Sequence, residues 1–126
     1  KTGGSEEFVS GLRRGYESFG IAWRLLDDIQ DLGDDMADGT RSAVYVCLDD
    51  RGRALWDEGG QSRGIDADRR IEAICAMIHN EKVLETVAAR IVSELDNAAA
   101  LAAGIGLTGL AGEYRALAGP VRGFIG

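Results

Sequence analysis

The sequence predicts an all-α protein, a helical bundle built from two long helices and several short ones. Three observations support this prediction. Only one of the 126 residues is proline. Alanine, the best helix former, is frequent. Apolar residues recur at steps of three and four in two long stretches, 8–36 and 83–101, which is the spacing of a helix face packed against other helices.

The composition narrows the possible functions. The chain has the length of one domain, with 45% hydrophobic and 28% charged residues and a net charge of −7. An acidic chain without a basic patch is a poor partner for nucleic acid. No apolar run reaches the ~20 residues that span a bilayer. Cys47 and Cys75 are isolated in sequence, which favours buried thiols of a reducing, cytoplasmic compartment over a disulfide or a zinc site.

The first predicted helix begins at a cap on Ser5 and ends at Gly39. At 1.5 Å per residue its about 33 residues correspond to roughly 50 Å. Glu6 and Glu7 lie in its first turn, where the helix dipole favours acidic side chains. The apolar seam of this helix consists of Phe8, Leu12, Gly15, Phe19, Ala22, Leu26, Ile29, Gly33 and Met36.

Short elements are predicted for the middle of the chain. Residues 42–48 have the β-branched and aromatic composition of a strand. Because no second strand is available to pair with them, we expect a short buried helix there. Residues 49–52 are expected to form a turn, and the polar, glycine-rich residues 57–65 a flexible loop. The arginines of this region are interpreted as solvated loop charges: Arg51, Arg53 and Arg63.

A helix capped by Asp66 or Asp68 is predicted next. Its apolar side consists of Ile71, Ile74, Cys75 and Ile78. His79 is the only histidine and has no second histidine or cysteine pair beside it in sequence. We therefore interpret His79 as a polar residue at the helix end rather than a metal ligand or a base.

The second long helix is expected to start at Asn80 and to end at the glycines of residues 104–106. Its core residues are Val83, Leu84, Val87, Ile91, Leu95, Ala98 and Leu101. A last amphipathic helix is predicted over 110–121. We expect an interruption near Pro120, since proline cannot donate to the backbone ladder of a helix.

Six of the residues between positions 27 and 38 are aspartate. Aspartate is a poor residue for a helix interior, and these carboxylates repel one another unless a cation lies among them. Asp27 and Asp31 project from one face, and Asp28 and Asp35 join Asp31 in a neighbouring row. Such oxygen ligands suit Mg²⁺, which completes its shell with water and substrate phosphate. From spacing alone, the alternative is a solvated acidic face at the end of a surface helix.

The residues around the cluster are more specific. Gly20, six intervening residues and Asp-Asp-Ile-x-Asp are followed by Asp38-Gly39-Thr40-Arg41-Ser42. This stretch resembles the second aspartate-rich region of the trans-prenyl diphosphate synthases. These class I isoprenoid synthases are all-helical enzymes whose DDxxD motifs hold Mg²⁺ against an allylic diphosphate. The resemblance covers residues 16–48 well and extends loosely to a closing helix near Glu113–Arg122.

The resemblance implies an isoprenoid synthase-like fold in which residues 1–126 are the C-terminal half. By the same resemblance, Asp27, Asp28 and Asp31 match the DDxxD motif as Mg²⁺ ligands. The chain departs from the family at Trp23-Arg24, where Phe-Gln is usual, and at Arg41, which does not fill the usual lysine position. The segment from 31 to 39 is also shorter than in the family. A first aspartate-rich region, which the family carries upstream on another helix, is not in this sequence.

The function expected from these residues is Mg²⁺-dependent prenyl transfer to or from an allylic diphosphate. The chemistry needs no protein nucleophile, because metal ions and an apolar interior stabilise the separating charges. Arg24 and Arg41 are the candidate contacts to the diphosphate. The expected partners are an isoprenoid diphosphate and either the N-terminal half or a second copy of the chain. The alternative is a non-catalytic helical partner-binding module that retains the fold.

Overall fold

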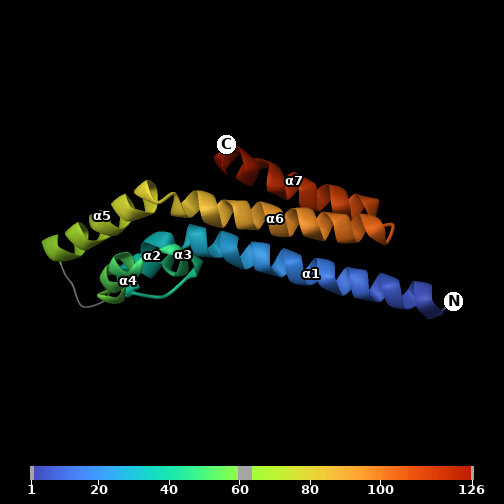
Figure 1. Cartoon of the computed structure of the whole chain (residues 1–126), viewed down its shortest axis with the longest axis horizontal. Helices are drawn as coiled ribbons and strands as arrows, with labels where there is room; N and C mark the ends of the chain where they lie inside the picture. The colour runs from blue at the N-terminus through green and yellow to red at the C-terminus, as the bar shows by residue number, and fades with distance from the viewer. Residues whose placement is uncertain (1, 60–63, 126) are drawn as a thin grey trace. The chain divides into compact units, whose positions relative to one another are not determined.

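The computed structural model describes residues 2–59 and 64–125 (Figure 1). Within these residues the protein is all-helical and has no strand, as the sequence predicted. None of the helices in the described part of the chain is long and apolar enough to cross a membrane. The helices are α1 (Thr2–Gln30), α2 (Leu32–Asp38), α3 (Ala43–Cys47), α4 (Asp50–Asp57), α5 (Ile65–Asn80), α6 (Val83–Gly104) and α7 (Thr108–Ile125).

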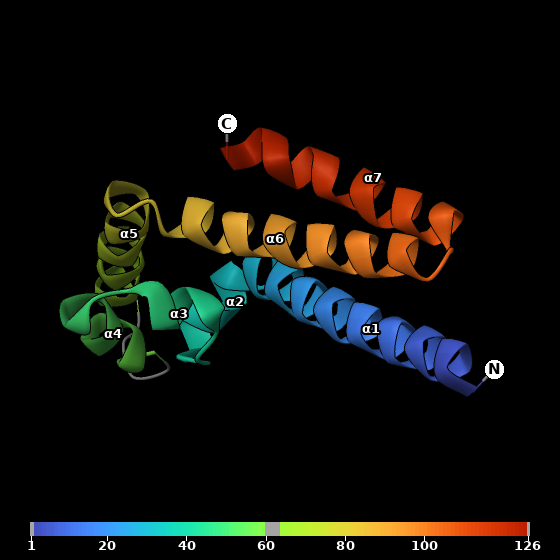
Figure 2. The same cartoon turned by 45° about the vertical axis from the view of Figure 1, so that its right-hand side comes forward.

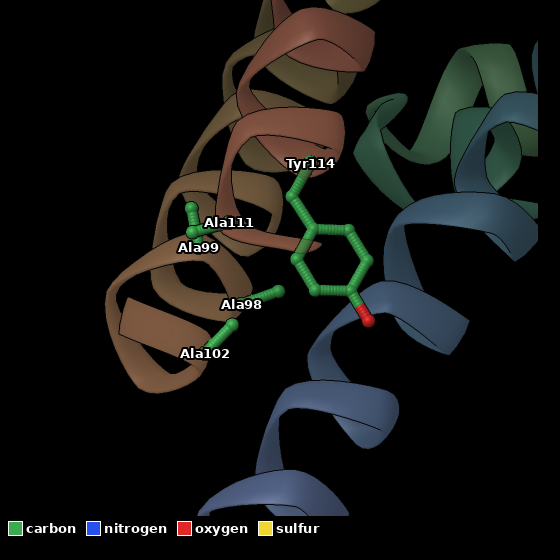
Figure 3. Packing of buried hydrophobic residues seen from close by; sticks show 5 residues of the cluster. All are labelled: Ala98, Ala99, Ala102, Ala111 and Tyr114. Carbon is green, nitrogen blue, oxygen red and sulfur yellow. The ribbon is translucent and has the colours of Figure 1, made fainter. Parts of the chain in front are cut away.

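The chain divides into two compact units, and each is described by itself. The first comprises residues 1–24 and 88–126, so it contains most of α1, most of α6 and all of α7. In this unit α6 runs alongside both α1 and α7 (Figures 1 and 2). Its core is made of small residues and one aromatic ring: Ala98, Ala99, Ala102, Ala111 and Tyr114 (Figure 3). Alanines on facing helix surfaces allow a close approach of the backbones.

Tyr114 connects α7 to α1 in this unit. Its ring lies 5.3 Å from the ring of Phe19, centroid to centroid, and Figure 3 shows it reaching from α7 towards α1. A polar contact joins α1 to α6, because Asn97 Nδ2 donates to the hydroxyl of the buried Ser18 at 2.7 Å. On the surface, Arg122 of α7 donates to Asp96 of α6 at 2.9 Å. These contacts fix the pairing of the three helices by more than apolar burial alone.

The turn between α6 and α7 is a glycine-dependent helix stop, as the sequence predicted. Gly106 has a φ of 86°, a left-handed conformation that glycine adopts without strain. Its N–H donates to Ala103 O at 3.1 Å, and the N–H of Leu107 donates to Ala102 O at 2.9 Å. These two bonds satisfy the last carbonyls of α6 in a Schellman arrangement.

The predicted interruption of the last helix at Pro120 is wrong. Helix α7 continues through Pro120 to Ile125. Proline removes the bond that its own N–H would have made to the carbonyl four residues earlier, that of Ala116, and its ring crowds the same carbonyl. Both Ala116 and Pro120 are exposed, so water can satisfy this carbonyl and the helix need not end.

The second unit comprises residues 25–87. Here α2 and α4 both pack against α5, and α3 packs against α4. Among the described residues, the largest fully buried side chain is that of Trp56 on α4; Ile74 is buried as completely, and Leu48 almost as completely. The helix predicted over 42–48 is confirmed as α3, which places Val44 in the core.

The first long helix differs from its prediction at both ends. It begins at Thr2 rather than at a cap on Ser5, and α1 ends at Gln30. Asp31 is the junction to α2, with φ −90° and ψ 8°, although its N–H still donates to Asp27 O at 2.8 Å. The aspartates and Gly33 around this point are weak helix formers, so the sequence gives little support to a straight continuation of α1. The chain bends instead, and α2 packs on α5.

Two helix starts were predicted wrongly in this unit. Residues 49–52 are not an isolated turn but the start of α4, where Asp49 accepts a hydrogen bond from Gly52 N at 2.8 Å. Helix α5 begins after Gly64, and neither Asp66 nor Asp68 caps it; both lie in its first turn. The central part of the loop predicted over 57–65, including Arg63, lies outside the described residues.

Several individual side chains also correct the sequence interpretation. Cys47 and Cys75 are both exposed, not buried. Arg53 is not a solvated loop charge, because its guanidinium donates to the main-chain oxygens of Tyr45 and Val46. Asn80 ends α5 instead of starting the next helix, which begins at Val83. His79 is an exposed residue in the last turn of α5, in agreement with the sequence.

Candidate metal and diphosphate site

Asp27 and Asp31 lie on the surface of the second unit, and both are exposed. The backbone bond from Asp31 N to Asp27 O keeps the two residues one helical turn apart across the α1–α2 junction. Asp31 itself caps no backbone N–H with its side chain, so its carboxylate is not used at the start of α2. The helix geometry therefore leaves these two carboxylates accessible to solvent cations.

Asp28 makes a different contact. Its Oδ2 accepts a hydrogen bond from the backbone N–H of Ala43 at 3.0 Å, and the residue is half-buried. Ala43 is the first residue of α3, whose first N–H groups have no partner within the helix. Asp28 thus caps α3 from a helix 15 residues earlier in the chain. This structural role engages one of its two carboxylate oxygens.

Asp35 of α2 is the aspartate of this cluster whose pKa shifts. Its pKa is raised by partial burial first, and then by the negative charges of Asp31, Asp28, Asp34 and Asp38. The ionised form of Asp35 is therefore disfavoured by burial and by the four nearby negative charges. The sequence placed Asp35 in the second aspartate row but not among the expected metal ligands.

The fit of these residues to Mg²⁺ depends on how many protein ligands are required. Among the described residues, no group of three or more histidine, cysteine, aspartate or glutamate side chains is arranged to hold a metal ion. Residues 2–59 and 64–125 therefore form no dedicated all-protein cage. Mg²⁺ usually takes one or two carboxylates and completes its shell with water and phosphate oxygens. The exposed pair of Asp27 and Asp31 fits that second type of binding in its donor chemistry.

The two arginines expected to contact diphosphate occupy different settings. Arg41 forms a two-point contact with Asp57 of α4, from Nε to Oδ1 at 3.1 Å and from Nη2 to Oδ2 at 3.2 Å. Its guanidinium also lies 4.9 Å from the centre of the Tyr45 ring. The hydrogen bond with Asp57 raises the pKa of Arg41. Arg24 is exposed on α1 and belongs to the first unit.

The segment that carries Arg41 is held at several points. Gly39 ends α2 in a left-handed conformation with φ 76°, and its N–H donates to Asp35 O. The indole N–H of Trp56 donates to Thr40 O at 3.0 Å. A side chain at Gly59 would collide with the backbone of Gly39, so the two chain segments touch through their main chains. The turn is thus built into the fold of the second unit.

Arg70 is the residue that sequence reasoning missed. It is 5% exposed, and its guanidinium donates to Met36 O at 2.6 Å and to Leu55 O at 3.0 Å. The carbonyls belong to the C-terminal parts of α2 and α4. A signal was present in the sequence, because Arg70 precedes the buried Ile74 and Ile78 by one and two helical turns. An arginine on the apolar side of a helix indicates a buried guanidinium with internal acceptors.

No protein-family model, no curated protein and no solved structure matches this chain. The interpretation of the acidic residues therefore depends on the residues themselves and on the motif that they form.

Proposed function

We propose that this chain is the C-terminal part of a Mg²⁺-dependent isoprenoid diphosphate synthase. The observation that carries the proposal is the acidic surface at the end of α1 and along α2. It contains the DDxxD residues Asp27, Asp28 and Asp31, and the charges of Asp31 and Asp28 add to the effect of burial in raising the pKa of Asp35. Repulsion of this kind is relieved when a cation binds.

In this proposal Asp27 and Asp31 bind the cation, and Asp28 supports them from its position against α3. Bound Mg²⁺ supplies positive charge that stabilises the diphosphate leaving group. The protein's own contribution has two parts. It fixes the two carboxylates one helical turn apart. It also holds the loop at residues 39–42 close to α4. The prenyl chain requires apolar cover, which the N-terminal half of such an enzyme provides in this proposal.

Thermal unfolding of the 126-residue chain with Mg²⁺ and inorganic diphosphate tests the proposal. A ligand that binds only the native state raises its melting temperature. We expect a rise of several degrees that disappears when Asp27 and Asp31 are both replaced by Asn. The matched control replaces Asp66 and Asp68, two exposed aspartates in the first turn of α5, and should retain the rise. An equal rise in the Asp27/Asp31 variant would refute the site.

A second candidate function is a non-catalytic helical module that binds a partner protein. Two observations favour it. Arg41 is already paired with Asp57, and Asp28 already accepts from Ala43, so two of the expected ligand groups are used within the fold. Titration with inorganic diphosphate, with and without Mg²⁺, separates the candidates. Metal-dependent diphosphate binding favours the synthase, whereas its absence at millimolar concentration favours the module.

A further inference from the structure

The carboxylate of Asp57 is held by three donor groups, as a bound anion would be. Arg41 donates from Nε to Oδ1 at 3.1 Å and from Nη2 to Oδ2 at 3.2 Å. The hydroxyl of Tyr45 donates to Oδ2 at 3.0 Å. Two parallel bonds from one guanidinium are the geometry with which arginine binds carboxylates and phosphates alike. The place that the Asp57 carboxylate occupies is therefore also suited to two phosphate oxygens.

The pair of Arg41 and Asp57 lies on the surface, where charged partners exchange readily. The two side chains are 65% and 39% exposed, respectively. Exposed ion pairs contribute little free energy, because water and salt compete for both charges. A second guanidinium adds positive charge here, since those of Arg41 and Arg53 lie 4.9 Å and 6.0 Å from the centre of the Tyr45 ring. A diphosphate, which carries more negative charge than one carboxylate, can therefore displace Asp57 from Arg41.

The backbone around Arg41 is anchored to the acidic helices by contacts that do not involve the Asp57 side chain. On one side, the N–H of Thr40 donates to Asp35 O at 3.0 Å. On the other, the N–H of Ala43 donates to Asp28 Oδ2 at 3.0 Å. Two residues span at most about 7 Å, so the Cα of Arg41 lies within that distance of the Cα of Ala43. Arg41 can thus change its partner next to the DDxxD motif while the backbone stays in place.

We propose that Asp57 is an intramolecular competitor of the substrate, whose carboxylate occupies the phosphate-binding position of Arg41 and Tyr45 until diphosphate displaces it. The inference rests on the proposed function and adds a regulatory contact to it. Without ligand, the charge of Arg41 is balanced by Asp57, so the position attracts anions weakly. Diphosphate held by Mg²⁺ on the neighbouring aspartates takes the guanidinium from Asp57. The apparent affinity for diphosphate is then reduced by the fraction of molecules in which Asp57 holds Arg41.

Calorimetric titration of the 126-residue chain with inorganic diphosphate in excess Mg²⁺ provides the test. In Asp57→Asn the competing charge is gone, and we expect the dissociation constant to fall about three- to tenfold. A purely structural Asp57 would give unchanged or weaker binding, because its replacement removes contacts of the native fold. The matched control Glu58→Gln removes the same charge from the adjacent, exposed residue at the end of α4. It should change the dissociation constant less than about twofold.

The double variant Arg41→Gln/Asp57→Asn should lose the gain in affinity, because the guanidinium that Asp57 releases is the group that binds the phosphate. In the native chain, the NMR signal of the Arg41 Nε–H should shift when Mg²⁺ and diphosphate are added together. An Asp57→Asn variant that binds no tighter than the native chain, a double variant that keeps the gain, or an unshifted Arg41 signal would each overturn the proposal.

The same titrations separate this inference from the proposed function. If the native chain and Asp57→Asn bind diphosphate equally, and binding is lost when Asp27 and Asp31 are both replaced by Asn, the competitor is refuted and the proposed metal site stands. If neither the native chain nor Asp57→Asn binds diphosphate at millimolar concentration, the proposed function is refuted and the competitor with it.

Discussion

The guanidinium of Arg70 donates to the main-chain oxygen of Met36, 34 residues earlier in the chain, at 2.6 Å. Its other terminal nitrogen donates to Leu55 O at 3.0 Å and to Trp56 O at 3.4 Å. One buried cation thus joins the C-terminal parts of α2 and α4 to α5. The carbonyl end of a helix carries partial negative charge, so these acceptors stabilise the guanidinium although no carboxylate contacts it among the described residues.

Replacement of Arg70 should destabilise the protein severely. In Arg70→Met the carbonyls of Met36 and Leu55 lose a buried donor, and each such loss costs about 1–3 kcal/mol. We expect the free energy of unfolding in urea to fall by about 2–4 kcal/mol. Arg69 is the matched control, since it is the adjacent arginine on α5 and is exposed. If Arg69→Met and Arg70→Met lost stability equally, the contacts of Arg70 would not be what stabilises this unit.

The pair of Arg41 and Asp57 should make stability depend on pH in the acid range. The pKa of Asp57 is lowered, first by the hydrogen bond from Arg41 and also by that from Tyr45, against partial desolvation. A carboxyl whose folded pKa lies below its unfolded value of about 3.9 stabilises the fold above that pH. The contribution is lost as the pH falls through the folded pKa.

Comparison with Asp57→Asn measures this contribution. The variant should be less stable than the native chain at pH 6, and the difference should shrink at pH 3 and below. Asp50→Asn serves as control, because Asp50 is fully exposed and its carboxylate lies 3.8 Å from the guanidinium of Arg53. A stability difference between native chain and Asp57→Asn that does not change with pH would contradict the ion pair.

Asp35 should change the pH dependence of stability in the direction opposite to that of Asp57. Its folded pKa is raised by burial and by the surrounding aspartates, so ionised Asp35 disfavours the fold. This penalty is absent below the unfolded pKa and grows as the pH rises through the folded pKa. We expect Asp35→Asn to stabilise the protein at pH 7 by roughly 0.5–1 kcal/mol, from like-charge pairs worth about 0.2–0.5 kcal/mol each. The gain should vanish near pH 3 and decrease with salt.

The same variant can be compared with Glu72→Gln, which removes one exposed negative charge from α5. Glu72→Gln should change the unfolding free energy little at any pH. If Asp35→Asn instead destabilised the chain at pH 7, the carboxylate would be making a favourable contact that outweighs the repulsion.

Two glycines of the second unit should respond oppositely to alanine. Gly33 lies within α2, and a Cβ there would meet no atom within 4 Å, so Gly33→Ala should stabilise by about 0.5 kcal/mol. A Cβ at Gly59 would collide with the backbone of Gly39, and backbone atoms cannot move aside as a flexible side chain can. We expect Gly59→Ala to destabilise by about 1–3 kcal/mol in urea unfolding. Equal effects at the two positions would contradict the close approach of the two segments.

The long helices were predictable because their apolar residues repeat with the helical period over many turns. Helix α4 was not, because residues 49–52 have the composition of a turn and only tertiary contacts make them helical. These include the burial of Trp56 and the hydrogen bonds from Arg53 to the carbonyl oxygens of α3. Local sequence cannot report such partners.

The acidic surface was predictable in part. Its aspartates are adjacent in sequence, so the helical period alone places them on neighbouring faces. The contact of Asp28 with Ala43 and the pairing of Arg41 with Asp57 join different helices, and spacing along one helix carries no information about them. The exposure of Cys75 was misjudged for a related reason, since the apolar stripe of α5 is narrower than its sequence suggested.

The two exposed thiols allow spectroscopy on the native sequence. Cys47 on α3 and Cys75 on α5 both belong to the second unit, and the chain has no other cysteine. Spin labels on this pair would report the distance between α3 and α5 without any engineered cysteine. Arg70 helps to hold these helices in place through its contacts with α2 and α4. A broadened distance distribution in Arg70→Met, under conditions where the chain stays helical, would separate loss of helix packing from loss of secondary structure.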